Sequence, residues 1–159
     1  MLHASYIGKF GIVHLLQVLD YDAEVSAENG YGVNPLHEVA KNEWKSEEGN
    51  VHVTQLLLPL EHSADVNTRC KEHQISLHCA SYFGRTNLVH LSLNRGAEAN
   101  VEDEYGEKSL HKVARNVCES QEDCVRVAHG VSSPIQTMSI KSCNGCWVDL
   151  SAQGVNTTG

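Results

Sequence analysis

The chain has few aromatic and few basic residues, and each shortage excludes a class of protein. Phe, Trp and Tyr make up 6% of the 159 residues, which suits a stack of slim helices better than one bulky core. Lys and Arg number 12 against 20 Asp and Glu, for a formal net charge of −8. Phosphate backbones and anionic membranes favour basic side chains, so we expect neither nucleic acid nor a membrane as partner. A basic protein partner is electrostatically favoured.

Long apolar runs and a secretory signal are missing as well. No stretch of about 18 apolar residues is present, and the N-terminus lacks a charged start followed by a hydrophobic block and a small-residue cleavage site. We therefore expect a soluble intracellular monomer, cytoplasmic by default, with the nucleus also open. In a reducing compartment cysteines are more often free thiols than disulfides. This expectation covers Cys70, Cys79, Cys118, Cys124, Cys143 and Cys146.

Residues 77–100 set the pattern for the rest of the chain. Residues 77–83 and 88–93 each carry an apolar stripe at helical spacing, and Gly84 and Gly96 end the two helices. A helix pair this thin cannot bury its own stripe. It needs copies of itself on either side.

Related blocks occur along the chain. Three begin with Leu-His, at 36–37, 77–78 and 110–111, in steps of 41 and 33 residues, and similar small-residue closes lie at 22–25, 64–67 and 96–100. A step of 33 residues is the period of ankyrin repeats. The sequence therefore resembles ankyrin repeats over residues 1 to about 129. The Thr-Pro that precedes Leu-His in the family is kept only as Asn34-Pro35.

The resemblance implies an all-α protein, an α-solenoid of about three and a half helix-turn-helix repeats with β-turn fingers. The expected units are 1–33, 34–74, 75–107 and 108–129, and polar loops at 42–50 and 116–123 interrupt the second and fourth. Over 130–159 the pattern fails, apart from a vestigial repeat close at 148–158, so we expect an irregular, poorly ordered tail.

Two local expectations concern the first unit. Ile12 lies at helical spacing with the leucines that follow and is expected on the buried face of a helix. In the turn after it, Asn29, Gly30 and Gly32 are expected to supply the left-handed backbone angles of a tight finger.

The ten histidines invite a metal or catalytic hypothesis. In ankyrin-like units the histidine of each Leu-His pair hydrogen-bonds neighbouring turns, and we interpret His37, His78 and His111 in this way. No Gly-x-Ser-x-Gly, catalytic triad or phosphate-cradling glycine motif is present. We therefore predict a protein that is not an enzyme and that needs no cofactor and no metal.

Cys143-Asn144-Gly145-Cys146 is the sharper motif, because two thiolates beside a tight turn form half of a zinc site or a redox pair. The strand and helix of a thioredoxin-like unit are missing, and the other ligands near it are Cys118, Cys124 and His129. A metal or redox module here is one alternative function. A truncated array without a function of its own is another.

The function that the resemblance implies is a non-catalytic scaffold that presents a concave surface to a protein partner. Its candidate contacts are polar or aromatic residues on the fingers and on the first helix of each unit. The fingers carry Asn29, Tyr31, Lys71, Glu72, His73, Glu104, Tyr105 and Glu107, and the helix face carries Glu38, Tyr82, Lys112 and Arg115. Tyr31 and Tyr105 occupy matching x-Tyr-Gly positions. They are either partner contacts or rings that pack across their own turns.

Overall fold

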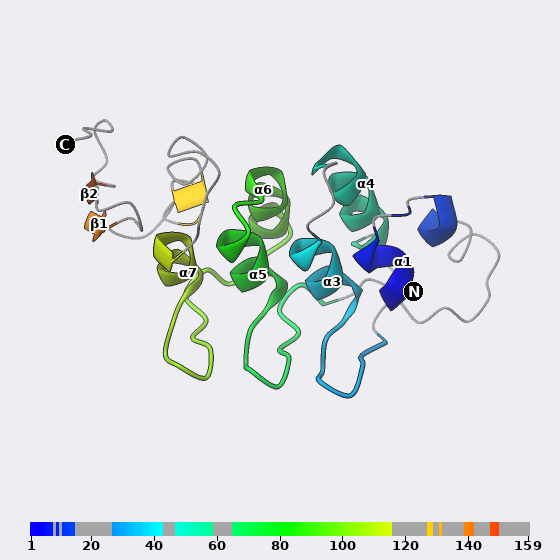
Figure 1. Cartoon of the computed structure of the whole chain (residues 1–159), viewed down its shortest axis with the longest axis horizontal. Helices are drawn as coiled ribbons and strands as arrows, with labels where there is room; N and C mark the ends of the chain where they lie inside the picture. Colours follow the sequence, from blue (N-terminus) through cyan, green and yellow to red (C-terminus); the bar gives the residue numbers. More distant parts are fainter. Residues whose placement is uncertain are drawn as a thin grey trace.

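The computed structural model describes residues 1–7, 9, 11–14, 27–42, 47–58, 65–115, 127–128, 131, 139–141 and 147–149. Helices dominate these ranges: α1 (Leu2–Tyr6), α3 (Pro35–Lys41), α4 (Glu47–Leu57), α5 (Ser76–Tyr82), α6 (Thr86–Asn94) and α7 (Ser109–Arg115). Residues 11–14 add a further helical turn. Figure 1 shows α1, α3, α5 and α7 following one another along the long axis, with α4 beside α3, α6 beside α5 and long loops projecting from one edge.

The helices form two rows. In the first row α1 contacts α3, α3 contacts α5 and α5 contacts α7, while α4 and α6 contact each other in the second row. The pairs α3 with α4 and α5 with α6 join the rows. A stack of helix pairs in which each pair touches its neighbours is an α-solenoid. The predicted fold class is therefore confirmed.

One apolar cluster runs through the stack, from Ala4 to Val131, and Leu56 and Leu91 pack against its rim. Neighbouring helix pairs thus share a core, as the sequence predicts. The expectation for Ile12 is wrong: its side chain is 48% exposed, and Val13 beside it is fully buried. The helical turn of residues 11–14 lies at one end of the stack, with no described helix beyond it (Figure 1).

The start of α3 shows how local sequence sets the helices. The Asn34 side chain accepts a hydrogen bond from the His37 backbone N–H at 3.1 Å, which satisfies a donor that the first helical turn leaves without a partner. Pro35 follows in the first turn, where its missing N–H costs nothing. The helix therefore begins at Pro35, with Asn34 as its cap.

The polar segment 42–50 differs from the predicted solvated loop at both ends. Asn42 and Asn50 are each 1% exposed, and the Asn42 amide donates to the Asn50 side-chain oxygen at 3.0 Å. Helix α4 already begins at Glu47. A buried amide pair thus closes the insertion, because a buried polar group needs a partner.

Long loops precede α3, α5 and α7, and we call residues 27–34, 67–75 and 100–108 the first, second and third fingers. Each turns through one residue with positive φ: Gly32 at 69°, His73 at 57° and Gly106 at 72°. Asn29 and Gly30 do not take such angles, contrary to expectation. Gly32 is also required by space, because a Cβ there would lie 3.2 Å from the Cα of Cys70.

Residues near the C-terminus form a short antiparallel strand pair, β1 (Ser139–Lys141) and β2 (Trp147–Asp149), with Ile140 opposite Val148. The sequence did not predict these strands. The other residues of the expected irregular tail, apart from Val131, lie outside the described ranges. Among the described helices, none is long and apolar enough to cross a lipid bilayer.

Candidate functional site

Backbone hydrogen bonds join the three fingers to one another. The Lys71 N–H donates to the Tyr31 carbonyl at 2.9 Å, and the Glu104 N–H donates to the Glu72 carbonyl at 3.0 Å. Adjacent fingers therefore keep a fixed register. Figure 1 shows them as a row along one edge of the stack.

Side chains at the base of the first and third fingers hold the tips in shape. The Asn29 side-chain oxygen accepts from the backbone N–H of Tyr31 at 2.8 Å, and Asp103 accepts in the same way from Tyr105 at 2.9 Å. Each oxygen also accepts from a second N–H two residues further on. Asn29 is thus used within its own turn, as Asx residues often are.

These turns place two tyrosines at the fingertips. Tyr31 is 72% exposed and Tyr105 is 73% exposed, so neither ring is buried across its own turn. Glu72 takes the same place in the second finger, followed by the exposed His73. The fingertips therefore present aromatic and charged groups to solvent.

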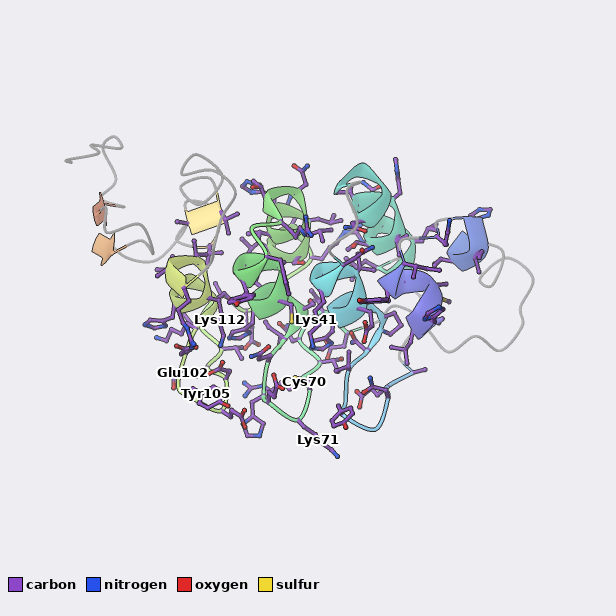
Figure 2. The ribbon with its side chains drawn as sticks, viewed as in Figure 1. Lys41, Cys70, Lys71, Glu102, Tyr105 and Lys112 are labelled. Carbon is purple, nitrogen blue, oxygen red and sulfur yellow. The ribbon has the colours of Figure 1, made fainter. Side chains whose placement is uncertain are left out.

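Each tyrosine ring lies near one ammonium group. The Lys71 Nζ is 5.8 Å from the ring centroid of Tyr31, and the Lys112 Nζ is 5.9 Å from that of Tyr105. Both separations lie within the range of a cation–π attraction. The two lysines differ in position: Figure 2 shows Lys71 projecting from the tip of the second finger and Lys112 at the level of the helices.

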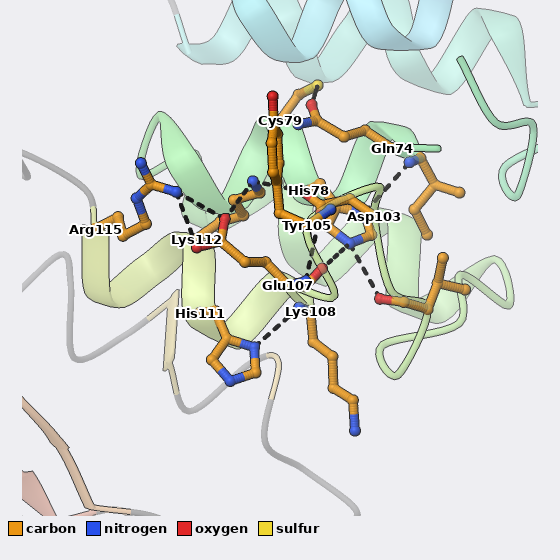
Figure 3. Close-up of polar contacts among 12 residues, drawn as sticks. Gln74, His78, Cys79, Asp103, Tyr105, Glu107, Lys108, His111, Lys112 and Arg115 are labelled. Atoms are coloured by element: carbon orange, nitrogen blue, oxygen red, sulfur yellow. Dashed lines mark hydrogen bonds and ion pairs between the residues drawn. The ribbon is translucent and has the colours of Figure 1, made fainter. Parts of the chain in front are cut away.

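Lys112 lies in a network of ion pairs (Figure 3), with its side chain 8% exposed. Its Nζ lies 2.5 Å from a carboxylate oxygen of Asp103 and 2.7 Å from one of Glu107, and Arg115 binds Glu107 at 2.8 Å. We predicted Lys112 on the partner-binding face. The structure turns it inward, because its charge compensates the fully buried side chain of Asp103.

The network also fixes the ionisation of its acids. Burial by itself would raise the pKa of Asp103, but the Lys112 ammonium and the N–H groups of Glu107 and Tyr105 outweigh it and hold that pKa below its usual value. The hydrogen bond from Lys112 lowers the pKa of Glu107 as well. Both carboxylates are therefore charged at neutral pH, and the third finger is tied to α7.

The other residues predicted on the helix face occupy different settings. Glu38 is half-buried on α3, and this burial raises its pKa. Tyr82 is 42% exposed at the end of α5, with its ring edge-on to Phe83 at 5.1 Å. Arg115 is exposed on α7, although Glu107 already binds its guanidinium. Tyr82 and Arg115 are thus exposed, whereas Glu38 is not.

His37 joins two neighbouring units. Its Nδ1 accepts from the Asn34 backbone N–H at 3.4 Å, and its Nε2 donates to the Gln74 carbonyl of the second finger at 2.9 Å. Burial lowers the pKa of His37 to about 4, which leaves the imidazole neutral at physiological pH. The predicted structural role is confirmed for this residue.

His78 repeats the arrangement one unit further on. Its Nδ1 accepts from the Ile75 N–H at 3.3 Å, and its Nε2 lies 3.1 Å from the Val101 carbonyl and 3.2 Å from that of Glu107. Burial lowers its pKa, so it too is neutral. The second and third fingers are each held by a histidine from the preceding unit.

His111 makes the same contact within its own unit that His37 and His78 make. Its Nδ1 accepts from the Lys108 N–H at 2.9 Å, and its side chain is exposed. The residues that would follow in a next unit are largely outside the described ranges. For His111 the contact to a neighbouring turn therefore stays a prediction.

The cysteines of the described residues are buried and free. Burial raises the pKa of Cys79 to about 12, so this thiol does not form a reactive thiolate. Cys143 and Cys146 lie outside the described residues. Within the described residues, no three His, Cys, Asp or Glu side chains gather as metal ligands would.

Several cross-unit contacts escaped the sequence analysis. Asn67 donates to the Gly96 carbonyl at 3.1 Å and accepts from the Glu98 N–H at 2.9 Å. Arg85 and Arg95 donate to carbonyls of the preceding unit, those of Asn42 and Leu58. The matching positions of Asn29 and Asp103, five residues before each helix cap, were a signal that could have identified the Asx turns.

Paired helices that share one core, with fingers held in register, define a repeat protein of the solenoid class. The chain belongs to the ankyrin-repeat family: the family described as "Ankyrin repeats (3 copies)" matches residues 1–103. A curated relative, the E3 ubiquitin-protein ligase hecd-1 of Caenorhabditis elegans, is 36% identical over 98 residues. That match covers 62% of this chain, and the chain spans 3% of the length of the relative. Ankyrin repeats are typically protein–protein interaction modules, and the repeats themselves are not catalytic.

Proposed function

We propose that the chain is a scaffold that binds a protein partner through its fingertips and the neighbouring helix face. The observation that carries the proposal is the register of the fingers, which the Lys71-to-Tyr31 and Glu104-to-Glu72 backbone hydrogen bonds maintain. Because these bonds fix the fingertips before binding, a partner meets side chains whose backbone is already ordered. Less conformational entropy is then lost on association.

The proposed contact surface consists of exposed residues whose side chains are not needed to hold the fold together. Tyrosine suits such a surface, because its ring offers a large contact area and a polar end. Asn29, Glu107, Lys112 and Arg115 support this surface through contacts within the chain, and the half-buried Glu38 borders it. Its proposed members are Tyr31, Lys71, Glu72, His73, Tyr82, Glu104 and Tyr105.

The overall charge supports a protein partner with a basic contact region. The formal net charge of −8 raises the encounter rate with a positively charged protein and lowers it with an anionic one. Contacts near the rim of an interface act mainly on this rate. Added salt should therefore slow association more than it speeds dissociation.

The proposal is tested with a partner captured from lysate and then purified. Tyr31→Ala with Tyr105→Ala should weaken binding of that partner by roughly tenfold or more, because exposed tyrosines are frequent interface hot spots. The matched control replaces Gln55 and His90 by alanine, two exposed positions on α4 and α6 in the second row. Circular dichroism confirms that every variant keeps its helices. Unchanged binding by the tyrosine variant removes the fingertips from the interface.

A further inference from the structure

The two tyrosine fingertips look alike in sequence, and one ammonium group lies near each ring, but the other charges around the two rings differ. At the first junction, between the first and second fingers, Tyr31 pairs with Lys71: the two backbones are hydrogen-bonded at 2.9 Å and the ammonium lies near the ring. Gly30 precedes Tyr31 and adds no charge. The first junction is therefore an aromatic ring beside an exposed lysine.

At the second junction, between the second and third fingers, Tyr105 lies beside carboxylates. Glu104 precedes it, and the Glu104 N–H donates to the carbonyl of Glu72 at 3.0 Å, which brings two exposed acids onto adjacent tips. A hydrogen bond to Glu104 and the negative charges of Glu104 and Glu72 raise the pKa of Tyr105. The second junction is an exposed ring within a negative field.

Basic side chains near the second junction are engaged elsewhere. The Lys112 ammonium binds Asp103 and Glu107, and the Lys108 Nζ lies 3.9 Å from a carboxylate oxygen of Glu102. Among the described residues, neither Glu72 nor Glu104 has a basic side chain within ion-pair distance. The Glu72 carboxylate, the acceptor sites of Glu104 that Tyr105 does not use and the open part of the Tyr105 ring remain available to a cation from outside.

We propose that the second junction, formed by Glu72, Glu104 and Tyr105, binds an arginine side chain of the partner protein, and that the first junction does not. A guanidinium is planar, stacks on an aromatic ring and pairs with carboxylates through several N–H donors. At the first junction, the exposed Lys71 ammonium repels a second cation, whereas the Lys112 ammonium near Tyr105 is neutralised by Asp103 and Glu107. The inference rests on the proposed scaffold function and assigns a partner chemistry to one part of its surface.

The test uses a short capped peptide of glycine and serine with one central arginine, titrated into the whole chain. Binding is followed by NMR through the ring signals of both tyrosines. The Tyr105 signals should shift and saturate, and those of Tyr31 should not. A lysine peptide should bind more weakly than the arginine peptide, and a glutamine peptide should show no saturable binding. Equal shifts at the two rings, or equal binding of the arginine and glutamine peptides, would overturn the inference.

Variants separate the junction from the general charge of the protein. Glu72→Gln with Glu104→Gln should weaken the arginine peptide by roughly fivefold or more, as expected for loss of charge-assisted hydrogen bonds. Glu28→Gln with Glu98→Gln removes the same charge from exposed positions outside the junction and should have little effect. Equal weakening by the two pairs would show attraction by net charge alone and would contradict the proposal.

The two proposals can fail separately. If the captured partner needs the fingertip tyrosines but the arginine peptide does not bind, the scaffold function stands and the partner chemistry is wrong. If the peptide binds at Tyr105 while the tyrosine variants leave partner capture unchanged, the binding site is real and the proposed interface is wrong.

Discussion

Leu88 and Ile12 hold equivalent places in two units but have opposite surroundings. Leu88 is 2% exposed on α6, which packs against α4, whereas Ile12 is 48% exposed at the N-terminal edge of the stack. The same type of residue in the same local pattern is thus core in one unit and surface in the other. The comparison shows that burial in this fold is supplied by the neighbouring unit.

The largest expected effect tests this comparison directly. Leu88→Ala should lower the free energy of unfolding by about 2–5 kcal/mol, because it leaves a cavity in the shared core. Ile12→Ala should change it by about 0.5 kcal/mol or less, as surface substitutions usually do. Urea unfolding followed by circular dichroism measures both. Similar losses for the two variants would show that the N-terminal edge is buried in solution.

Measuring stability as a function of pH tests the contact that His37 makes between two units. Burial, together with the nearby charges of Lys41 and His78, lowers the pKa of His37 in the folded chain from its ordinary 6.5 to about 4. The unfolded chain therefore binds more protons between these values, so stability is complete above pH 6.5 and falls as the pH drops towards 4. The decrease in the free energy of unfolding that His37 causes should reach about 3 kcal/mol.

The control for this titration is His37→Gln, which keeps a donor but cannot titrate. Other acid-sensitive groups, His78 included, remain in both proteins, so the difference between the two curves isolates His37. The variant should be less stable at neutral pH, and its free energy of unfolding should fall less than that of the unaltered chain when the pH is lowered. Parallel curves from pH 7 to 4 would contradict a buried neutral His37.

We expect the smallest change in stability from substitutions in the turns of the second and third fingers. His73 adopts a φ of 57°, which disfavours a residue with a Cβ, whereas glycine takes the equivalent place at Gly106. His73→Gly should be neutral or stabilising by up to about 1 kcal/mol, and Gly106→Ala should be destabilising by a similar amount. Thermal unfolding compares them. A clear loss on His73→Gly would mean that the histidine side chain stabilises its finger.

The sequence predicted the features that repeat. The Leu-His pairs, the apolar stripes and the matching Tyr-Gly positions recur at fixed places, so one unit could be interpreted from another. His37 and His78 were assigned correctly for this reason. Ile12 was not, because its exposure depends on what lies beside the unit, and this information is absent from the local pattern.

The candidate surface was harder to predict, because charge pairing between elements is not periodic. Asp103 and Lys112 both look like ordinary surface residues in the sequence, and they come together only when the third finger folds onto α7. Lys71 and Glu72 are adjacent in the chain, yet Lys71 lies near Tyr31 of the first finger and Glu72 contacts Glu104 of the third. The positions of these residues on the fingers were predictable, whereas their partners were not.

Hydrogen exchange in His78→Ala tests most directly whether neighbouring units hold each other. His78 lies on α5, but its Nε2 contacts the carbonyls of Val101 and Glu107 in the third finger. Removing it should speed exchange of the amides of Asp103 and Gly106, which close that finger, as well as amides of α5. Faster exchange confined to α5, with the third finger unchanged, would contradict the coupling of units on which this account depends.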